Sequence, residues 1–275
     1  MTNTATPLDI IIVSYNTRED LLACLRSLHE HAPLRPHSVV VVDNGSSDGS
    51  PEAVRQTFGA VRVIEMGRNA GFAAANNAGI RATTSPLIVL LNSDTLVGAG
   101  ALDRLCERAE ATGATAAGPR LVNQQRRAEL SWGHMLTPVS EWRQARLVRG
   151  NDAGAPWAMA EVEALTTQER DVDWVSGACL LVRRDAALRA GLLDERYFMY
   201  EEDVDFCAAL RADGGRVLFT PAAEITHLRG RSIKSLSGPP PRYYQESHQA
   251  FYAKHTPRWV PWLRLWQAIR SLRRR

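Results

Sequence analysis

The sequence lacks the marks of several protein classes. No apolar run approaches the roughly 18 residues that a membrane-spanning helix needs, and the N-terminus has no signal-peptide pattern. No C-x-x-C pair occurs, and the glycine-containing segments match neither G-x-G-x-x-G nor the P-loop. The four cysteines are scattered, which predicts buried thiols in a reducing cytoplasm rather than a disulfide framework. They are Cys24, Cys106, Cys179 and Cys207.

Acidic residues are missing after Glu246, although the whole chain carries a net charge of only +3. That final segment holds seven arginines and lysines, so the rest of the chain is net acidic and is not expected to bind nucleic acid. Trp259, Trp262 and Trp266 lie among these basic residues. We therefore predict a basic amphipathic tail over residues 246–275 that lies on an anionic membrane, with packing of its tryptophans on the body as the alternative.

Apolar runs alternate with helical patterns over the first 120 residues. The strands are expected at residues 8–14, 39–42, 61–65, 87–91 and 114–118, and the helices after Thr17, after Pro51, and near 71–82 and 101–111. Repeated units of this length predict an α/β fold with a mostly parallel sheet flanked by helices.

The pattern weakens over residues 124–170, which we interpret as an irregular insertion. A buried strand is then expected at 173–182, helices at 185–190 and 201–212, a short strand at 216–219 and a loop from Ile225 to His227.

Polar residues follow two of the apolar strands. Asn92-Ser93-Asp94 follows the run from Leu87 to Leu91, and Asp43-Asn44 follows the run from Val39 to Val42. Ligands of open α/β sheets bind beyond the carboxyl ends of the strands. Asp94 is therefore a candidate to hold a divalent cation against a phosphorylated ligand, and Asp43 or Asn44 to accept from a base imide N–H. Ordinary Asx and glycine turns are the alternatives.

The segment from Arg68 to Asn77 combines a cation, small residues and paired asparagines. Small residues allow a ligand to approach the start of a helix, and a helix N-terminus attracts phosphate. We interpret this segment as part of a phosphate-binding region, with alanine-rich core packing as the alternative.

Four acids occur among the five residues from Glu201 to Asp205, more than a helix start requires. One of these carboxylates is a candidate general base for an acceptor hydroxyl. His227 is a candidate metal ligand together with Asp94, although a lone histidine is more often a hydrogen-bonded bystander.

Taken together, the motifs resemble those of family 2 glycosyltransferases, which have the GT-A fold. The particular residues in these motifs are similar to those of the rhamnosyltransferase branch. The matching segments are Val13–Asn16, Val42–Ser46, Arg68–Phe72, Asn92–Asp94, Trp174–Ala178, Glu202–Asp203 and His227–Ser232. The resemblance implies a GT-A domain over residues 1–245, divided into a nucleotide-sugar-binding half (8–120) and an acceptor and catalytic half (121–245).

The resemblance also implies roles for individual residues. Tyr15 would lie against the nucleobase, with Asp43 or Asn44 reading it, and the other donor-binding residues would be Ser14, Arg68, Asn69, Asn92 and Ser93. Asp94 matches the last acid of the family's D-x-D motif, whose first acid is Asn92 here. This leaves Mg²⁺ or Mn²⁺ to Asp94, assisted by His227.

On the acceptor side, the resemblance implies that Asp203 is the catalytic base and Glu202 its acidic neighbour. Trp174 and Gly177 match acceptor-site positions. Arg231 and Lys234 are candidates, from position alone, to contact the diphosphate.

These implications define an inverting, metal-dependent transferase at the inner face of the plasma membrane. The expected donor is a dTDP- or UDP-sugar, with dTDP-L-rhamnose favoured, and the expected acceptor is a cell-envelope glycan or a polyprenyl-diphosphate-linked saccharide. Galactofuranosyl, glucosyl and N-acetylhexosaminyl transfer are alternatives within the family. A non-catalytic nucleotide-sugar-binding subunit and a nucleotidyltransferase are alternatives from other classes.

Overall fold

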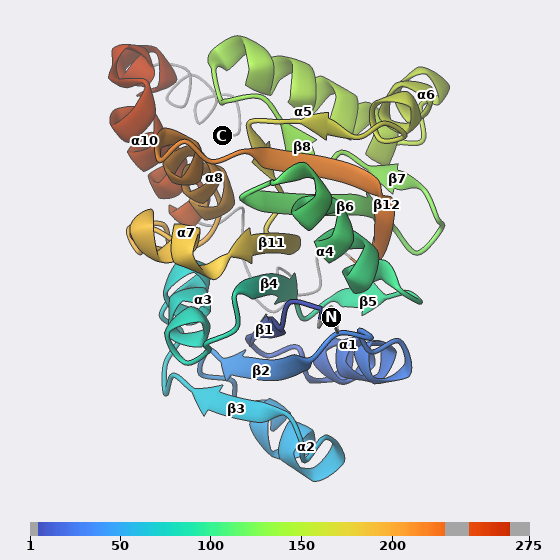
Figure 1. The fold of residues 1–275 in the computed structure, drawn as a ribbon. Helices are drawn as coiled ribbons and strands as arrows, with labels where there is room; N and C mark the ends of the chain where they lie inside the picture. The colour runs from blue at the N-terminus through green and yellow to red at the C-terminus, as the bar shows by residue number, and fades with distance from the viewer. Residues whose placement is uncertain (1–4, 229–241, 265–275) are drawn as a thin grey trace.

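A central sheet with helices on both faces organises the computed structural model, which describes residues 5–228 and 242–264 (Figure 1). The sheet order is β3-β2-β1-β4-β11-β6-β12-β5, with β7 beside β6 and β9 beside β12, while β10 and β8 form a separate pair. The strands are β1 Leu8–Ser14, β2 His37–Asp43, β3 Arg62–Glu65, β4 Leu87–Asn92, β5 Thr95–Val97, β6 Ala116–Val122, β7 Ala128–Glu129, β8 Trp132–Gly133, β9 Arg170–Asp171, β10 Trp174–Val175, β11 Cys179–Arg183 and β12 Val217–His227.

The helices complete the alternation that the apolar pattern predicted. They are α1 Arg18–Glu30, α2 Ser50–Thr57, α3 Phe72–Arg81, α4 Ala101–Thr112, α5 Pro138–Asp152, α6 Pro156–Leu165, α7 Arg184–Arg189, α8 Glu202–Ala212 and α10 Arg242–His255, followed by the 3-10 turn Pro257–Trp259. In Figure 1, α3, α7, α8 and α10 lie on the left and α1 on the right, while α4 lies in front of the middle of the sheet. The predicted α/β fold with a mostly parallel sheet is confirmed.

Side chains alternate across the sheet, as the two-residue period of a strand requires. In β1, Ile11 and Val13 join the apolar cluster that includes residues of α3 and α8, whereas Ile10 and Ile12 join the cluster that includes residues of α1 and α4. All of β1 is buried. Burial on both faces explains the continuous apolar runs of the first half of the sequence.

β1 lies between β2 and β4 and is parallel to both. Val13 is in register with Val42 of β2 and with Asn92 of β4, so the three strands end at the same edge. The chain order changes direction between β1 and β4, which is the switch point where ligands of open α/β sheets bind. This edge carries the polar residues that follow each run.

The predicted strand over residues 173–182 is two strands in the structure. Trp174 pairs with Gly133 in β8, while β11 inserts antiparallel between β4 and β6. The chain leaves the ladder between the two strands, where the Ser176 N–H donates to the Ser131 carbonyl at 2.8 Å. A Cβ on Gly133 would lie 2.6 Å from the Trp174 ring, so a residue without a side chain is needed opposite that tryptophan.

The insertion is more regular than predicted. α5 begins with a capping box in which Thr137 and Ser140 exchange hydrogen bonds, and α6 packs against it. The helices escaped prediction because they share only a small apolar cluster and expose Val139, Trp142 and Trp157, so no apolar stripe marks them.

β12 is also longer than predicted, because it continues through a register shift between Thr220 and Glu224. Pro221 in this bulge hid the continuity of the strand in the sequence. The extended strand carries His227 to the edge of the sheet where Asp94 lies.

The helix α10 crosses the predicted boundary between the domain, which ends at residue 245, and the tail, which begins at residue 246, and it buries Phe251 and Tyr252 in the core. Leu263 is also buried, Trp259 is partly buried, and Trp262 is 64% exposed. Trp266 and the rest of the tail lie outside the described residues. No described helix is both long and apolar enough to cross a membrane. All four cysteines are buried, as predicted.

Candidate active site

The carboxylate of Asp43 lies at the end of β2 with one oxygen engaged and one unpaired. Oδ2 accepts from the backbone N–H groups of Gly45 at 3.1 Å and Ser46 at 2.9 Å. Oδ1 is buried and has no hydrogen-bond partner among the described residues. A buried acceptor without a partner is costly unless a ligand satisfies it, so Oδ1 is available to a donor such as a base imide N–H.

Asn44, the alternative candidate for contact with the base, uses its side-chain amide in hydrogen bonds within the protein. Its Nδ2 donates to Asn69 Oδ1 at 2.9 Å and to the Gly71 carbonyl at 3.2 Å, and its Oδ1 accepts from the Ala70 N–H at 2.9 Å. Asn69 Oδ1 also accepts from the Gly71 N–H at 3.1 Å. Asn44 and Asn69 therefore tie the end of β2 to the loop before α3.

Close packing in the same place depends on Gly45. Its φ is +82°, and a Cβ there would lie 2.6 Å from the Arg68 carbonyl carbon. Arg68 itself has an exposed side chain at the rim, while Tyr15 is half-buried after β1. The glycine thus brings the donor-binding candidates of two loops together.

Hydroxyl groups connect the ends of β1 and β4. Thr17 Oγ1 lies 3.0 Å from Ser14 Oγ and 3.0 Å from Ser93 Oγ. Thr17, which the sequence suggested as the cap of α1, makes no side-chain cap hydrogen bond. Its hydroxyl instead fixes Ser14 and Ser93 beside the switch point.

The paired asparagines of α3 hold the protein together rather than face a ligand. Asn77 Nδ2 donates to the Leu193 carbonyl at 2.8 Å, and Asn77 Oδ1 accepts from the Leu193 N–H at 3.0 Å. At the helix start, the Phe72 N–H already donates to the Phe198 carbonyl at 2.8 Å. The first N–H group of this helix is therefore engaged by the protein itself.

Asp94 and His227 meet at the edge of the sheet, as predicted. His227 Nε2 lies 3.4 Å from Asp94 Oδ1, and its Nδ1 lies 3.2 Å from Glu129 Oε2. Burial lowers the pKa of His227, but the hydrogen bonds to Asp94 and Glu129 together raise it to about 9. Glu129 was not predicted from the sequence, because it lies 98 residues from His227 in an insertion without a recognisable pattern.

The fit of a metal ion to this edge rests on the available donors. Asn92 Oδ1 is buried and without a partner among the described residues, and Asp94 is buried beside it in sequence. An amide oxygen, a carboxylate and an imidazole suit Mg²⁺ or Mn²⁺. The described residues contain no group of three His, Cys, Asp or Glu side chains that could hold a metal. The protein therefore offers part of a coordination shell that phosphate oxygens and water would complete.

Asp203 lies at the start of α8 with its carboxylate fixed by backbone groups. Oδ2 accepts from the Gly177 N–H at 2.8 Å and Oδ1 from the Val204 N–H at 2.9 Å. Burial raises the pKa of Asp203 above its ordinary value, while these backbone hydrogen bonds oppose the rise. A raised pKa makes a carboxylate a better proton acceptor near neutral pH.

Glu202 is buried next to Asp203. Burial raises the pKa of Glu202 well above its ordinary value, and the charge of Asp203 raises it further. Glu202 Oε2 has no hydrogen-bond partner within the described part of the chain. The two neighbouring acids therefore have different roles, with Asp203 held by donors and Glu202 favouring the protonated form.

The segment from Ser176 to Ala178 joins the two halves of the site. The Asn92 N–H donates to the Ala178 carbonyl at 3.0 Å, and the Gly177 N–H donates to Asp203. A Cβ on Gly177 would lie 3.4 Å from both the Asp203 Cβ and the Phe72 ring. This short break between β10 and β11 brings Asp203 to the end of β4. The last residue of β4, Asn92, precedes Asp94 by two residues in the sequence.

Trp174 is the remaining predicted acceptor-site residue among those that the structure describes. Trp174 is buried, with its Nε1 donating to the His134 carbonyl at 2.9 Å, so its ring supports the site from the core. Arg231 and Lys234 lie outside the described residues.

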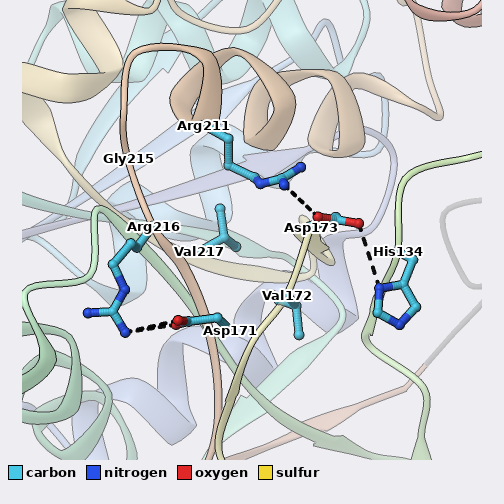
Figure 2. A pocket seen from close by; sticks show the side chains of 8 residues that line it. All are labelled: His134, Asp171, Val172, Asp173, Arg211, Gly215, Arg216 and Val217. Carbon is cyan, nitrogen blue, oxygen red and sulfur yellow. Dashed lines mark hydrogen bonds and ion pairs between the residues drawn. The ribbon is translucent and has the colours of Figure 1, made fainter.

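A hollow of about 300 Å³ lies near the C-terminal end of α8 (Figure 2). Its charges neutralise one another, because Arg211 pairs with Asp173 at 2.7 Å and Arg216 with Asp171 at 2.9 Å. Arg211 is about 12 Å along the helix from Asp203 at the usual rise per residue. The hollow is therefore separate from the residues at the strand ends.

Comparison with known proteins identifies the family. The model of the family described as glycosyl transferase family 2 matches residues 9–187. The chain is 34% identical over 238 residues to the N-acetylglucosaminyl-diphospho-decaprenol L-rhamnosyltransferase of Mycobacterium tuberculosis, covering 82% of this chain and 77% of that protein. It is 31% identical over 232 residues to the succinoglycan biosynthesis protein ExoO of Rhizobium meliloti, covering 81% of this chain and 61% of that protein.

The fold is similar to the crystal structure of GalNAc-T7 with UDP, GalNAc and Mn²⁺, with a TM-score of 0.61 and 17% identity. That similarity covers 91% of this chain and 51% of the other, so the chain spans about half of its length. The GT-A fold that the motifs implied is confirmed. Because the family model covers more than half of the chain and the mycobacterial relative is 34% identical over 82% of it, this protein belongs to glycosyltransferase family 2.

Proposed function

We propose that the protein transfers a sugar, with inversion, from a nucleoside diphosphate donor to a glycan or lipid-linked saccharide. The favoured donor is dTDP-L-rhamnose. The observation that carries this proposal is a connection between Asp203 and the end of β4. Asp203 accepts a hydrogen bond from Gly177, and the next residue, Ala178, accepts one from Asn92. Asn92 precedes Asp94 by two residues in the sequence. This connection brings a fixed carboxylate next to a candidate diphosphate site.

Donor recognition is assigned to residues 8–120. Asp43 Oδ1, buried and unpaired in the described chain, is the proposed acceptor for the imide N–H of uracil or thymine. Tyr15 would lie along the base, and Arg68 would add a cation at the rim. Asn44, Asn69, Ser14 and Ser93 support these loops from behind, as their mutual contacts favour.

Asp94, His227 and the Asn92 amide oxygen are the proposed protein ligands of Mg²⁺ or Mn²⁺. A bound divalent cation would supply Lewis-acid stabilisation of the negative charge on the departing diphosphate. Glu129 would orient the imidazole through Nδ1, as carboxylates do beside many metal-binding histidines. Arg231 and Lys234 remain proposed diphosphate contacts.

In the proposed reaction, Asp203 removes the proton of an acceptor hydroxyl. The acceptor oxygen forms a bond to the anomeric carbon as the bond from that carbon to the diphosphate oxygen breaks on the opposite face. The backbone donors at Gly177 and Val204 hold the Asp203 carboxylate in one orientation during this step. Gly177 leaves room for the acceptor, and Trp174 supports that wall.

The name of the mycobacterial relative supports L-rhamnose as the sugar and a polyprenyl-diphosphate-linked saccharide as the acceptor. A lipid-linked acceptor would require the enzyme to reach a membrane, and we assign it to the inner face of the plasma membrane. The exposed Trp262 and the neighbouring Arg258 and Arg264 support docking through the tail. The partly buried Trp259 and the buried Leu263 instead attach the start of the tail to the body.

Donor choice is tested by thermal shift with UDP-, dTDP- and GDP-sugars in the presence of Mn²⁺. Turnover with a lipid-linked acceptor and NMR of the product anomer then follow. The proposal expects the largest shift with a uracil or thymine nucleotide and a product of inverted configuration. A preference for a GDP-sugar or a retained configuration would contradict it. Binding of Mn²⁺ followed by electron paramagnetic resonance should weaken in Asp94→Asn whether or not the acceptor is known.

A further inference from the structure

His248 of α10 lies between two carboxylates that come from distant parts of the chain. Its Nδ1 lies 3.1 Å from Glu201 Oε1, and its Nε2 lies 3.4 Å from Glu141 Oε2. Glu141 belongs to α5 in the insertion, and Glu201 directly precedes α8. His248 is buried, so both contacts are shielded from water.

Each ring nitrogen of His248 faces an oxygen that accepts hydrogen bonds. A neutral imidazole has only one N–H, so donation to both carboxylates requires the imidazolium form. Burial lowers the pKa of His248, but the hydrogen bonds to Glu141 and Glu201 together raise it to about 9. Tyr244 and Tyr252 of the same helix lie beside the ring, with centroids at 5.5 Å and 5.0 Å. The site thus holds a cation between two acids at neutral pH.

The backbone at Glu201 is unusual. Tyr200 and Glu201 have φ values of +73° and +68°, in the left-handed region that residues with side chains rarely adopt. Such residues persist where the surrounding structure fixes them. α10 fixes this turn a second time, because Ser247 Oγ donates to the Met199 carbonyl at 2.9 Å. The turn is followed directly by Glu202 and Asp203 at the start of α8.

Acidic side chains crowd at the same turn. Burial raises the pKa of Glu201, the hydrogen bond and charge of His248 oppose the rise, and the charge of Asp203 adds to it. An imidazolium beside Glu201 therefore favours the carboxylate form of Glu201 and offsets its repulsion with Asp203.

We propose that His248 is a positioning residue, which as a cation between Glu141 and Glu201 holds the Tyr200–Glu201 turn and thereby keeps Asp203 aligned for catalysis. The inference rests on the proposed role of Asp203 as the base. It also assigns α10 and the insertion helix α5 a common purpose, because each contributes one side of the His248 contact.

The test compares His248→Gln and His248→Arg with the wild-type protein. Gln removes the charge and Arg retains a cation that can reach a carboxylate. We expect His248→Gln to lower kcat by about 10- to 100-fold while the KM and Kd for the donor change less than twofold, and His248→Arg to recover part of the loss. Glu141→Gln, which leaves α8 and its preceding turn unaltered, should lower kcat in the same direction.

Lys254 provides a matched control on the same helix. Its ammonium group lies 2.9 Å from Asp194 and 2.9 Å from Asp205 in the first turn of α8, so it attaches α10 to α8 without touching Glu201. Lys254→Met should lower the melting temperature yet leave kcat within twofold of wild type. An equal loss of kcat in Lys254→Met would show that only the docking of α10 matters and would overturn the proposal.

Hydrogen exchange separates this inference from the proposed function. Amides of residues 199–205 should exchange faster in His248→Gln than in Lys254→Met, whatever the substrate. Unchanged exchange there, or wild-type kcat in His248→Gln, would overturn the positioning role. Faster exchange in a protein without transferase activity would instead leave the positioning of the turn intact and refute the role of Asp203.

Discussion

The backbone N–H of Gly177 donates a 2.8 Å hydrogen bond to the carboxylate of Asp203, across a separation of 26 residues. Gly177 lies in the short break between β10 and β11, and Asp203 lies in the first turn of α8. A hydrogen bond to an ionised carboxylate stabilises the form that accepts a proton. This contact both orients Asp203 and limits how far burial raises its pKa.

Asp203→Asn should abolish most of the transfer, because the amide keeps the shape of the side chain but cannot accept the proton. We expect kcat to fall by about 10²–10⁴, the usual contribution of a general base. The donor Kd, measured by calorimetry, should change little because the donor contacts lie elsewhere. Turnover near wild type would remove Asp203 from the reaction.

The raised pKa of Asp203 also predicts the acid side of the pH profile. Below its pKa the carboxyl group is protonated and cannot act as a base. Because burial moves that pKa upward from its ordinary value, kcat should begin to fall at a higher pH than an exposed aspartate would give. A profile of kcat against pH with saturating donor measures this limb. A flat profile down to pH 4 would contradict the base assignment.

Asp43→Asn should weaken binding of a uracil or thymine nucleotide. In this variant, the side-chain amide can point an N–H group at the N–H group of the base, and two donors form no hydrogen bond. The loss of one charge-assisted hydrogen bond costs about 1.5–3 kcal/mol of binding free energy, or roughly 10- to 150-fold in Kd. Titration with UDP or dTDP measures the effect. CDP is the control nucleotide, since cytosine has no imide N–H; equal weakening for both nucleotides would argue against base reading.

Gly71→Ala should destabilise the fold at the start of α3. Its φ is +92°, and a Cβ would lie 2.7 Å from the Phe198 carbonyl oxygen, a backbone atom that cannot rotate away. We expect a loss of roughly 2–4 kcal/mol in the free energy of unfolding, from strain and overlap together. Urea titration provides the measurement.

Gly214→Ala is the matched control for that substitution. Its φ is +81°, but no atom of the described residues lies within 4 Å of the added Cβ. Only the conformational cost of about 1–2 kcal/mol should remain. Equal losses for the two substitutions would mean that the overlap with Phe198 is unimportant.

His248 should make stability depend on pH in a defined direction. Its pKa is about 9 in the folded protein, against 6.5 for an ordinary histidine. The stabilisation from its proton is therefore complete below about pH 6.5 and is lost as pH rises through 9. The difference in unfolding free energy between wild type and His248→Gln should be of order 1–3 kcal/mol at pH 6 and shrink by pH 10. A difference independent of pH would contradict the protonated state.

The sequence predicted the parts of the site that follow directly from local patterns. Asp43 and Asp94 follow apolar strands, and parallel strands end at one edge, so their neighbourhood follows from the alternation alone. The acids before α8 were likewise visible as a local excess. Which of Asp43 and Asn44 has an oxygen left unpaired among the described residues was not predictable, because it depends on the hydrogen bonds that engage Asn44.

Contacts between distant segments left no signal in the sequence. Glu129 reaches His227 across 98 residues, and His248 reaches Glu201 across 47. Both involve a strand or helix that a composition of mixed polar residues did not reveal. The antiparallel position of β11 in the sheet was also not predicted, because an apolar run does not show the direction of its partner strand.

The four buried thiols can report local unfolding of the protein through the rate at which a reagent labels them. Burial raises the pKa of each thiol, so little thiolate is present in the native state to react with a disulfide reagent. Cys179 lies in β11 of the central sheet, whereas Cys24, Cys106 and Cys207 lie on the helices α1, α4 and α8. The labelling rate of Cys207 relative to Cys179 would therefore report whether the helix bearing Asp203 detaches before the sheet unfolds.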